Sequence, residues 1–489
     1  MPAGFSATDF YYILPELVLT AGALLVLVVD LLFPRRDGAV FFTALVTLAV
    51  TGGFLLSFLG VDVTVSNGLL AIDGFAIFFK SIFLLSAAVT VLMSASYLKV
   101  EETRPGEYYF LVLCATLGMM FMASGIDLIT LFIGLETMAI AFYVLAGFLK
   151  PNRRSNEAAV KYFLLGAFSL GILLYGMSLL YGLTGTTTLN GIAAALVGAE
   201  RNLVLALALV LVAAGMGFKI AAVPFHMWAP DVYEGAPTPV TAFLSVGSKA
   251  AAFAMLARIL FVGLPGLVDD WQLIFALLAV VTMTVGNIAA ITQSNLKRML
   301  AYSSIAHAGY VLIGLVAGTE RGLAAMMVYL WVYLFMQFGA FAIVTMLRRH
   351  DVVGDELKDI SGLYFRSPLA AFAMLVFMLS LGGIPPTAGF MGKVWVFSAA
   401  IEAEWVWLAV IGVVNSAISI FYYIRVVVFM WFKEETIGSP VRVSPSMAVV
   451  LAVAVIGTVV FGVYPQILFN HAQIAAETVG AAVSTAALR

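Results

Sequence analysis

GFKIAAVPFHMWAPDVYEGAPTPVTAFLSVGSKAAAFAML, residues 217–256, decides how this chain folds. Two lysines, Lys219 and Lys249, lie in it among apolar residues, with Pro224 between them. A third lysine, Lys393, lies in the similarly apolar LGGIPPTAGFMGKVWVF. A charge near the centre of a bilayer is costly, so such residues face a bundle interior and mark an ion or proton path. Because a buried lysine is able to exchange a proton near neutral pH, the sequence indicates a proton-handling membrane protein.

The composition excludes several classes of protein. The 489 residues are 63% hydrophobic and 11% charged, and the net charge of −2 provides no basic surface for nucleic acid. Cys114 is the single cysteine, so an internal disulfide, an iron–sulfur cluster and a cysteine zinc site are excluded. The chain has no P-loop and no dinucleotide-binding glycine motif. Energy from ATP or NADH must therefore arrive through another subunit.

Apolar windows of about 20 residues predict about 14 membrane spans. We expect the spans at residues 11–32, 39–60, 74–97, 107–124, 126–149, 157–182, 202–223, 238–262, 272–292, 296–317, 322–346, 368–400 (interrupted), 405–432 and 446–469.

The charges between the spans predict the orientation. One set of connections holds most of the basic residues: Arg35, Arg36, Lys99, Arg104, Lys150, Arg153, Arg154, Lys297, Arg298, Arg348, Arg349, Lys358, Arg366, Lys433 and Arg442. The other set holds Arg201, Arg321 and the terminal Arg489 beside acidic residues. The positive-inside rule places the first set in the cytoplasm and both termini on the periplasmic side. An even number of spans independently requires that the termini share a side.

Prolines predict breaks in the seventh span, at Val223-Pro224, and in the twelfth, at GGIPP (382–386). Proline removes a helical donor and clashes with the preceding turn. A kink used for packing alone is the alternative, but a lysine close to each break favours a functional discontinuity.

The two breaks reveal an internal symmetry. Spans four to eight and nine to thirteen start on opposite sides, and in each set the fourth crossing is broken and carries a lysine. This arrangement is typical of transporters with inverted repeats. The predicted fold is an all-α polytopic membrane protein with two inverted five-helix repeats and two discontinuous helices. The expected parts are an N-terminal three-helix segment (1–106), a first repeat (107–262), a second repeat (263–432) and a last helix with a tail (433–489).

Glu136 lies about ten residues into the span IDLITLFIGLETMAIAFYVL, where an isolated carboxylate must be protonated or paired. Lys219 is its natural partner, and the pair would tune how readily the lysine releases a proton. A structural ion pair that locks two helices is the alternative.

Lys249 is expected near mid-bilayer, too deep to reach the surface, and is a candidate relay. His307 lies in AYSSIAHAGYVL, where Ser303, Ser304 and Tyr310 would carry a water chain from Lys249 to Lys393. A histidine held by a neighbouring helix is the competing interpretation. Lys393, beyond the second break, is the candidate outward terminus.

Other polar residues are weaker candidates for the proton path. His226, Asp231 and Glu234 follow the first break and either line an inward water entry or fix two helices together. Lys80 and Arg258 are expected to extend toward the outer surface.

The run GFKIAAVPFHMWAPDVYEGAPTPVTAFLSVGSKAAAFAML resembles the antiporter-like, proton-translocating family shared by respiratory complex I and the multisubunit sodium/proton antiporters. SNLKRMLAYSSIAHAGY and LSLGGIPPTAGFMGK support the resemblance, which covers nearly the whole chain.

The resemblance implies a fold of 14 helices with two inverted five-helix repeats. It also implies a proton pathway with a glutamate on the fifth helix and lysines on the seventh, eighth and twelfth, which here are Glu136, Lys219, Lys249 and Lys393. On this basis we expect a proton-translocating membrane-arm subunit of a bacterial NADH–quinone oxidoreductase, in the inner membrane beside other membrane-arm subunits. NADH, FMN, iron–sulfur clusters and quinone would be bound by those partners, with no cofactor or metal in this chain.

Two alternatives remain open. In a sodium/proton antiporter module, ion exchange would need no redox partner. In a scaffold, the buried charges would be replaceable without loss of pumping. Two broken helices and four buried charges argue against the scaffold.

Overall fold

The computed structural model describes residues 7–33, 36–348, 354–433, 441 and 443–487. Helices follow the apolar runs, because a segment in lipid must satisfy its backbone hydrogen bonds internally. The N-terminal part comprises α1 Ala7–Tyr12, α2 Leu14–Leu32, α3 Asp37–Leu56, β1 Val63–Val65, η1 Ser66–Gly68, β2 Leu70–Ile72 and α4 Gly74–Val100, with β1 and β2 paired antiparallel.

The central body follows in two groups of helices. The first comprises α5 Pro105–Ser124, α6 Leu128–Ala146, α7 Arg153–Thr184, α8 Leu189–Ala195, α9 Leu203–Ile220, α10 Trp228–Gly235, α11 Thr238–Phe243, η2 Leu244–Ser248, α12 Lys249–Ala257 and η3 Arg258–Gly263. The second comprises η4 Pro265–Leu267, α13 Val268–Ile291, α14 Leu296–Val316, α15 Glu320–Leu347, η5 Leu357–Ile360, α16 Leu363–Arg366, α17 Pro368–Gly382, α18 Ala388–Glu402 and α19 Val406–Phe432. The chain ends with α20 Pro445–Val463 and α21 Gln466–Ala487.

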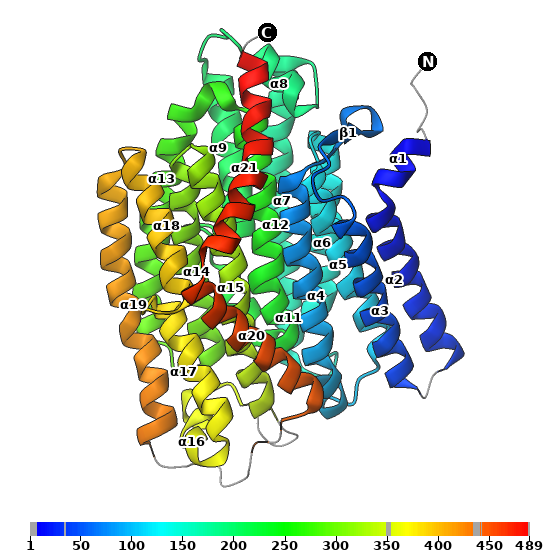
Figure 1. The fold of residues 1–489 in the computed structure, drawn as a ribbon, viewed down its shortest axis with the longest axis vertical. Coiled ribbons are helices and arrows are strands. Elements are labelled where there is room, and N and C mark those ends of the chain that lie inside the picture. The colour runs from blue at the N-terminus through cyan, green and yellow to red at the C-terminus, as the bar shows by residue number, and fades with distance from the viewer. Residues whose placement is uncertain (1–6, 34–35, 349–353, 434–440, 442, 488–489) are drawn as a thin grey trace.

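The expected all-α polytopic fold is confirmed. Within the described residues, 13 helices are long and apolar enough to cross a membrane. The shorter helices α17 and α18 together supply the interrupted crossing, which brings the total to the predicted number. Both ends of the described chain lie at the same end of the bundle (Figure 1), as an even number of crossings requires. The boundaries of the four expected parts remain a prediction.

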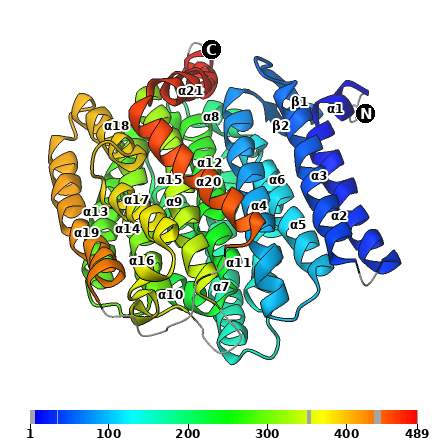
Figure 2. The same ribbon diagram turned by 60° about the horizontal axis from the view of Figure 1, so that its bottom comes forward.

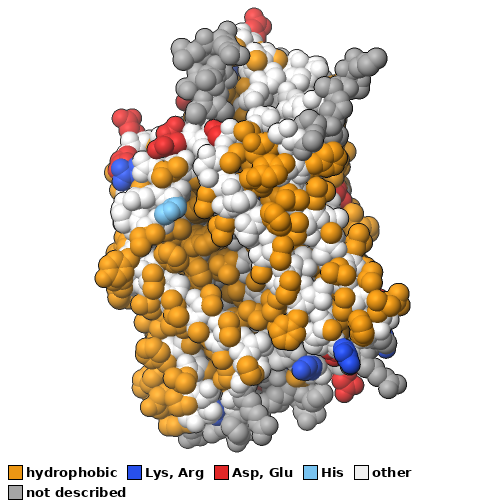
Figure 3. Space-filling view, turned by 45° about the vertical axis from the view of Figure 1, so that its right-hand side comes forward, with side chains coloured by type: hydrophobic (Ala, Val, Ile, Leu, Met, Phe, Trp, Pro, Cys, Tyr) orange, Lys and Arg blue, Asp and Glu red, His pale blue; other side chains and the backbone are white. Residues whose placement is uncertain are grey.

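The outer surface matches a bilayer. On the face shown in Figure 3, hydrophobic side chains form a broad middle band, and the charged side chains gather near the two ends. Exposed residues such as Phe42 (65%) and Phe168 (73%) belong to this apolar surface. Lipid or neighbouring membrane subunits therefore cover the flanks of the protein.

In each half of the protein, a glycine allows the first two helices to pack closely together. A Cβ atom at Gly118 of α5 would lie 2.4 Å from the backbone nitrogen of Met138 in α6. In the second half, a Cβ at Gly286 of α13 would lie 2.8 Å from the nitrogen of Ala306 in α14. Small residues allow membrane helices to approach this closely. The same device thus joins the first two helices of each half.

The last two helices, α20 and α21, pack along the outside of the helices that precede them. α20 packs against α15, α18 and α4, and α21 turns back across α15 to reach α4 again (Figures 1 and 2). Ala472, Ala476 and Val479 of α21 are fully buried in this contact. The C-terminal segment therefore connects the N-terminal helices to the second half of the bundle.

Candidate functional site

Both predicted helix breaks are present. α9 ends at Ile220, where Ala221 adopts a left-handed conformation (φ 58°), and the chain becomes helical again only at Trp228. α17 ends at Gly382, where Gly383 is also left-handed (φ 79°), and α18 begins at Ala388. A left-handed residue commonly terminates a helix because it turns the chain out of the helical path. The breaks expose backbone carbonyls inside the bundle.

Lys393 uses the carbonyls that the second break exposes. Its Nζ donates to the carbonyl oxygens of Leu381 (3.1 Å) and Gly382 (3.0 Å) and to Oγ of Ser416 (2.8 Å). These carbonyls form the negative end of the α17 dipole, which stabilises a cation. The same ammonium lies 5.0 Å from the centroid of the Tyr310 ring, and Lys393 is 3% exposed. Backbone carbonyls and a hydroxyl thus hold this charge inside the protein, and no carboxylate among the described residues pairs with it.

Lys219 and Glu136 are neighbours, but they do not form a direct ion pair. The two charges are close enough to interact electrostatically, yet the ion pairs within 4.0 Å among the described residues do not include this one. Nζ of Lys219, Oε1 of Glu136 and the hydroxyl of Tyr143 are all buried, and none of them has a hydrogen-bond partner in the part of the chain that the structure describes. Buried polar atoms of this kind are usually satisfied by ordered water. The geometry therefore favours a water-bridged pair over a locked structural bridge.

Lys249 is anchored on α14. Its Nζ donates to the carbonyl oxygen of Ser304 at 2.7 Å and to Oγ of the same residue at 2.6 Å. The side chain is 3% exposed, and the π-helix η2 directly precedes it. π-helical segments within α-helices occur frequently at functional sites. Lys249 is therefore a buried ammonium bound to a hydroxyl that is able both to accept and to donate a hydrogen bond.

His307 occupies the centre of a hydrogen-bonded cluster. Nδ1 lies 2.8 Å from the hydroxyl of Tyr329, and Nε2 lies 3.0 Å from the hydroxyl of Tyr423. The Tyr423 hydroxyl also lies 2.5 Å from Oγ of Ser303. Both ring nitrogens therefore have partners, as expected for a histidine that neighbouring helices hold in place. The same bonds connect the ring to Ser303, next to the serine that holds Lys249.

The ring of His307 lies within electrostatic reach of the charges of both Lys249 and Lys393. On the helix α14, Ser303, Ser304, His307 and Tyr310 recur at helical spacing and share one buried face. The structure thus brings together Lys249, His307 and Lys393, while Lys219 and Glu136 form a separate cluster near the first break.

Several members of these clusters were not predicted from the sequence. Tyr329, Tyr423, Ser416 and Tyr143 all lie on apolar helices, where a hydroxyl alone is a weak signal. Asn287 is a stronger signal that was overlooked: an amide in the middle of an apolar helix needs partners. It donates to the Tyr310 hydroxyl at 3.0 Å and so fixes the tyrosine that faces Lys393.

The polar stretch after the first break forms a clamp. Asp231 of α10 lies 2.6 Å from Nζ of Lys161 and 2.7 Å from Nη1 of Arg298, and Arg298 also bonds Glu234 at 2.9 Å. Burial acts to raise the pKa of Asp231, but the hydrogen bonds from Lys161 and Arg298 outweigh it and hold the pKa below its usual value. These bonds join α7, α10 and α14, which favours the helix-fixing interpretation.

Lys80 and Arg258 do not extend to the outer surface, so that expectation was wrong. Lys80 is 1% exposed and its Nζ lies 2.6 Å from Glu16. Arg258 is 2% exposed, bonds Asp73 at 2.7 Å and donates from Nε to the carbonyl oxygen of Ala123 at 3.1 Å. Both carboxylates are distant in the sequence from the cations they neutralise. From the sequence of one helix, the membrane surface is the only visible place for each cation. The tertiary structure instead supplies a carboxylate from a distant segment of the chain.

Comparisons with known proteins agree with this geometry. The family described as NADH:quinone oxidoreductase/Mrp antiporter, TM, matches residues 124–419. A Trichlorobacter lovleyi protein named NADH-quinone oxidoreductase subunit N is 46% identical over 473 residues, which cover 96% of this chain and 97% of that protein. A Koribacter versatilis protein named NADH-quinone oxidoreductase subunit N 1 is 46% identical over 491 residues, 96% of each chain.

Solved structures show the same fold. A chain of respiratory complex I from Thermus thermophilus is 35% identical, with a TM-score of 0.79 over 93% of this chain and 98% of that chain. A chain of the Mrp complex from Dietzia sp. has a TM-score of 0.84 at 20% identity, over 98% of this chain and 99% of that chain. The second likeness is one of fold alone.

Proposed function

Because the chain belongs to the NADH:quinone oxidoreductase/Mrp antiporter family of membrane subunits, we propose that it works as a proton-translocating membrane-arm subunit of an NADH–quinone oxidoreductase. The enzyme is the whole complex, and other subunits bind NADH, FMN, the iron–sulfur clusters and quinone. The proton relay in this chain consists of Glu136, Lys219, Lys249, His307 and Lys393.

The observation that carries the proposal is that adjacent serines of α14 are hydrogen-bonded, one to Lys249 and the other to the hydroxyl that contacts His307. Ser304 binds the lysine, and the adjacent Ser303 connects through Tyr423 to the imidazole. Hydroxyl groups both donate and accept hydrogen bonds, so a water molecule between Ser304 and Ser303 would complete a path along which a proton moves by exchanging these bonds. A scaffold would not need a line of hydroxyls between two buried basic groups.

The relay has a direction. A proton enters beside the broken α9–α10 region, reaches Lys249, and passes through the Ser303–Tyr423–His307 cluster to Lys393. It leaves toward the end of the bundle where the chain termini lie. The bonds of Lys393 to the open carbonyls of α17 hold the charged form, and release requires that these contacts weaken.

Lys219 and Glu136 act as the control element. When the carboxylate is charged and near, it stabilises the protonated lysine; when the two separate, the lysine loses this stabilisation and its proton moves on. A conformational or charge signal from a neighbouring subunit drives the change. Support comes from α6, where Ile133 and Ile140 are both 56% exposed on the side of the helix that Glu136 borders. A neighbour that covers this face would lie beside the carboxylate.

The chain is a multi-pass membrane protein of a respiratory complex, and its partners are other membrane-arm subunits. Its proposed place is the bacterial inner membrane, with both termini on the periplasmic side, because the basic connections gather at the opposite end. A sodium/proton antiporter module has weaker support, since the likeness to the Mrp chain extends only to the fold.

The test is Lys219→Ala in the assembled complex, with proton translocation per quinone reduced as the readout. We expect pumping to fall while assembly is retained. Lys150→Ala, at an exposed lysine outside the relay, is the matched control and should pump normally. Wild-type pumping by an assembled Lys219→Ala complex would refute the relay, and sodium-dependent exchange without redox subunits would favour the antiporter.

A further inference from the structure

Four buried polar atoms outside the relay have no hydrogen-bond partner in the part of the chain that the structure describes. They are the hydroxyls of Tyr233 and Tyr333 and both Oε1 and Nε2 of Gln337. Tyr233 and Gln337 are 0% exposed, and Tyr333 is 3% exposed. Buried polar atoms in proteins are nearly always bonded to protein or to ordered water, so four of them on three residues require an explanation.

These atoms lie beside Ser304, the serine that binds Lys249. The hydroxyls of Tyr233 and Tyr333 interact electrostatically with each other, and each is close to Oγ of Ser304 without completing a hydrogen bond to it. Gln337 follows Tyr333 by four residues on α15, so the two side chains share one face of the helix. α15 packs against α14, α11 and η2. A buried polar region therefore borders the lysine from α10 and α15.

The polar region extends away from His307 toward the end of the bundle where the basic connections gather. Tyr329 bonds His307, Tyr333 lies four residues further along α15, and Gln337 four residues further again. Each of these steps covers about 6 Å along a helix. The helix ends at Leu347, directly before a residue of the basic connections. Gln337 therefore lies on the inward side of Lys249.

A hollow of about 210 Å³ opens at this same end of the bundle. Asp231 and Glu234 of α10 line it, together with Arg298 of α14. Tyr233 stands between the two acidic residues in the sequence, but its side chain is fully buried. The short helix α10 therefore presents charged groups to the hollow and the Tyr233 hydroxyl to the interior.

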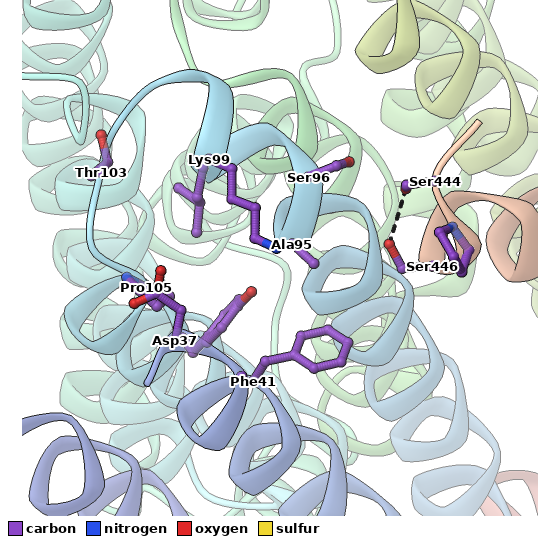
Figure 4. A pocket seen from close by; sticks show the side chains of 13 residues that line it. Asp37, Phe41, Ala95, Ser96, Lys99, Thr103, Pro105, Ser444 and Ser446 are labelled. Atoms are coloured by element: carbon purple, nitrogen blue, oxygen red, sulfur yellow. Dashed lines mark hydrogen bonds between the residues drawn. The ribbon is translucent and has the colours of Figure 1, made fainter. Parts of the chain in front are cut away.

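Figure 4 shows another hollow, of about 450 Å³, between α3, α4, α5 and α20. Asp37 and Lys99 line it, and both are exposed surface residues. None of its four helices carries a relay residue. This hollow is therefore a suitable place for a control variant.

We propose that ordered water molecules held by Gln337, Tyr333 and Tyr233 carry protons from the hollow under α10 to Ser304 and Lys249. The inference rests on the proposed function, because it supplies the inward half of the same relay. The amide of Gln337 binds water through one donor group and one acceptor, and the two hydroxyls do the same. Each transfer breaks one O–H bond and forms another. One proton taken from the hollow becomes one proton delivered to the neutral amine of Lys249.

A purely structural role and a water-binding role predict different responses to substitution. Gln337 forms no side-chain hydrogen bond among the described residues, so Gln337→Met removes no bond within the protein and keeps nearly the same volume. The variant should therefore be at least as stable as the wild type. It should nevertheless bind no water at this position, so proton entry should slow.

The test measures the rate of proton translocation by the assembled complex in inside-out membrane vesicles. We expect Gln337→Met to lower the rate roughly ten-fold. Tyr333→Phe should act in the same direction, since it keeps the ring that packs 5.1 Å from the His307 ring and loses only the hydroxyl. Two controls should pump normally: Lys99→Met in the hollow of Figure 4, and Tyr108→Phe, whose buried hydroxyl accepts from Ser94.

Two further readouts respond to water rather than to packing. Gln337→Ser leaves a hydroxyl and room for water, so it should retain most of the pumping that Gln337→Met loses. Lowering the external pH should also rescue Gln337→Met, because the supply of protons to a narrowed entrance rises with their concentration. A high-resolution cryo-EM map of the assembled complex should show water density beside Gln337 in the wild type and none there in Gln337→Met.

The outcomes separate this path from the relay itself. Normal pumping by Gln337→Met at every pH, or a wild-type map without water at Gln337, would overturn the path. If Lys219→Ala stops pumping while Gln337→Met does not, only the inward path is wrong. Normal pumping by an assembled Lys219→Ala complex would instead refute the proposed function.

Discussion

The hydroxyl of Tyr423 lies 3.0 Å from Nε2 of His307, and this contact joins α19 to α14 at the centre of the bundle. The same hydroxyl contacts Oγ of Ser303 at 2.5 Å. One side chain therefore connects Ser303, the neighbour of the serine that binds Lys249, with the imidazole of His307. The relay depends on a tyrosine whose helix supplies no buried charge.

Tyr423→Phe should slow proton translocation roughly ten-fold, because it removes the only hydroxyl that bonds both Ser303 and His307 among the described residues. The fold should survive, since the ring still packs. Tyr108→Phe is the matched control: its buried hydroxyl accepts from Ser94, outside the relay. Pumping per quinone reduced is the measurement, and equal effects of the two variants would contradict this role for Tyr423.

Lys249→Arg should abolish pumping while the complex assembles, because arginine keeps its charge and does not release a proton. The comparison is Lys297→Arg, at another buried lysine, whose Nζ donates to the carbonyl oxygens of Glu234 (2.8 Å) and Ala236 (2.7 Å) in a fixing role. That variant should still pump. Proton uptake by reconstituted vesicles distinguishes them, and active Lys249→Arg would remove this lysine from the relay.

Gly383→Ala should disturb the second break. Gly383 has φ 79°, and a Cβ there would lie 2.8 Å from Cδ of Lys393, so the variant combines backbone strain with displacement of the lysine. The strain alone costs about 1–2 kcal/mol. Gly382→Ala is the control, because its nearest contact, at 3.6 Å, is an ordinary one. We expect reduced pumping only in Gly383→Ala, measured at equal complex abundance.

Arg258→Met should destabilise the protein by about 3–5 kcal/mol, because it leaves Asp73 buried and charged without its partner. Adding Asp73→Asn should recover most of the loss, since asparagine removes the charge and still caps α4. Unfolding in a graded detergent series measures both variants. Additive losses in the double variant would show that the two residues do not act as a pair.

Acid should release the clamp at Asp231. Its pKa is depressed in the folded protein, so the stabilisation is fully present above the unfolded pKa and is lost as the pH falls through the folded value. The difference in melting temperature between wild type and Asp231→Asn should therefore be present at neutral pH and vanish in acid. Glu157→Gln, which alters an exposed pair on one helix, should change little. A pH-independent difference would contradict the ion-pair explanation.

The sequence by itself determined the elements that depend on local chemistry. Apolar length sets where a helix crosses, and prolines set where the crossings of α9 and α17 are interrupted, so the number of crossings and both breaks followed from local pattern. The buried lysines and Glu136 were also visible, because a charge in an apolar run is conspicuous whatever surrounds it.

Only the tertiary structure decided which groups are partners. Glu16 meets Lys80, Asp73 meets Arg258, and Tyr423 meets His307 across separations of 64 to 185 residues, as the paired numbers show. Each of these contacts needs one residue from each of two segments of the chain. The apolar pattern of one helix does not specify its neighbour, because any apolar helix of suitable shape would pack against it. Packing alone selects the neighbour, and in a membrane the cost of an unpaired charge then fixes the pair.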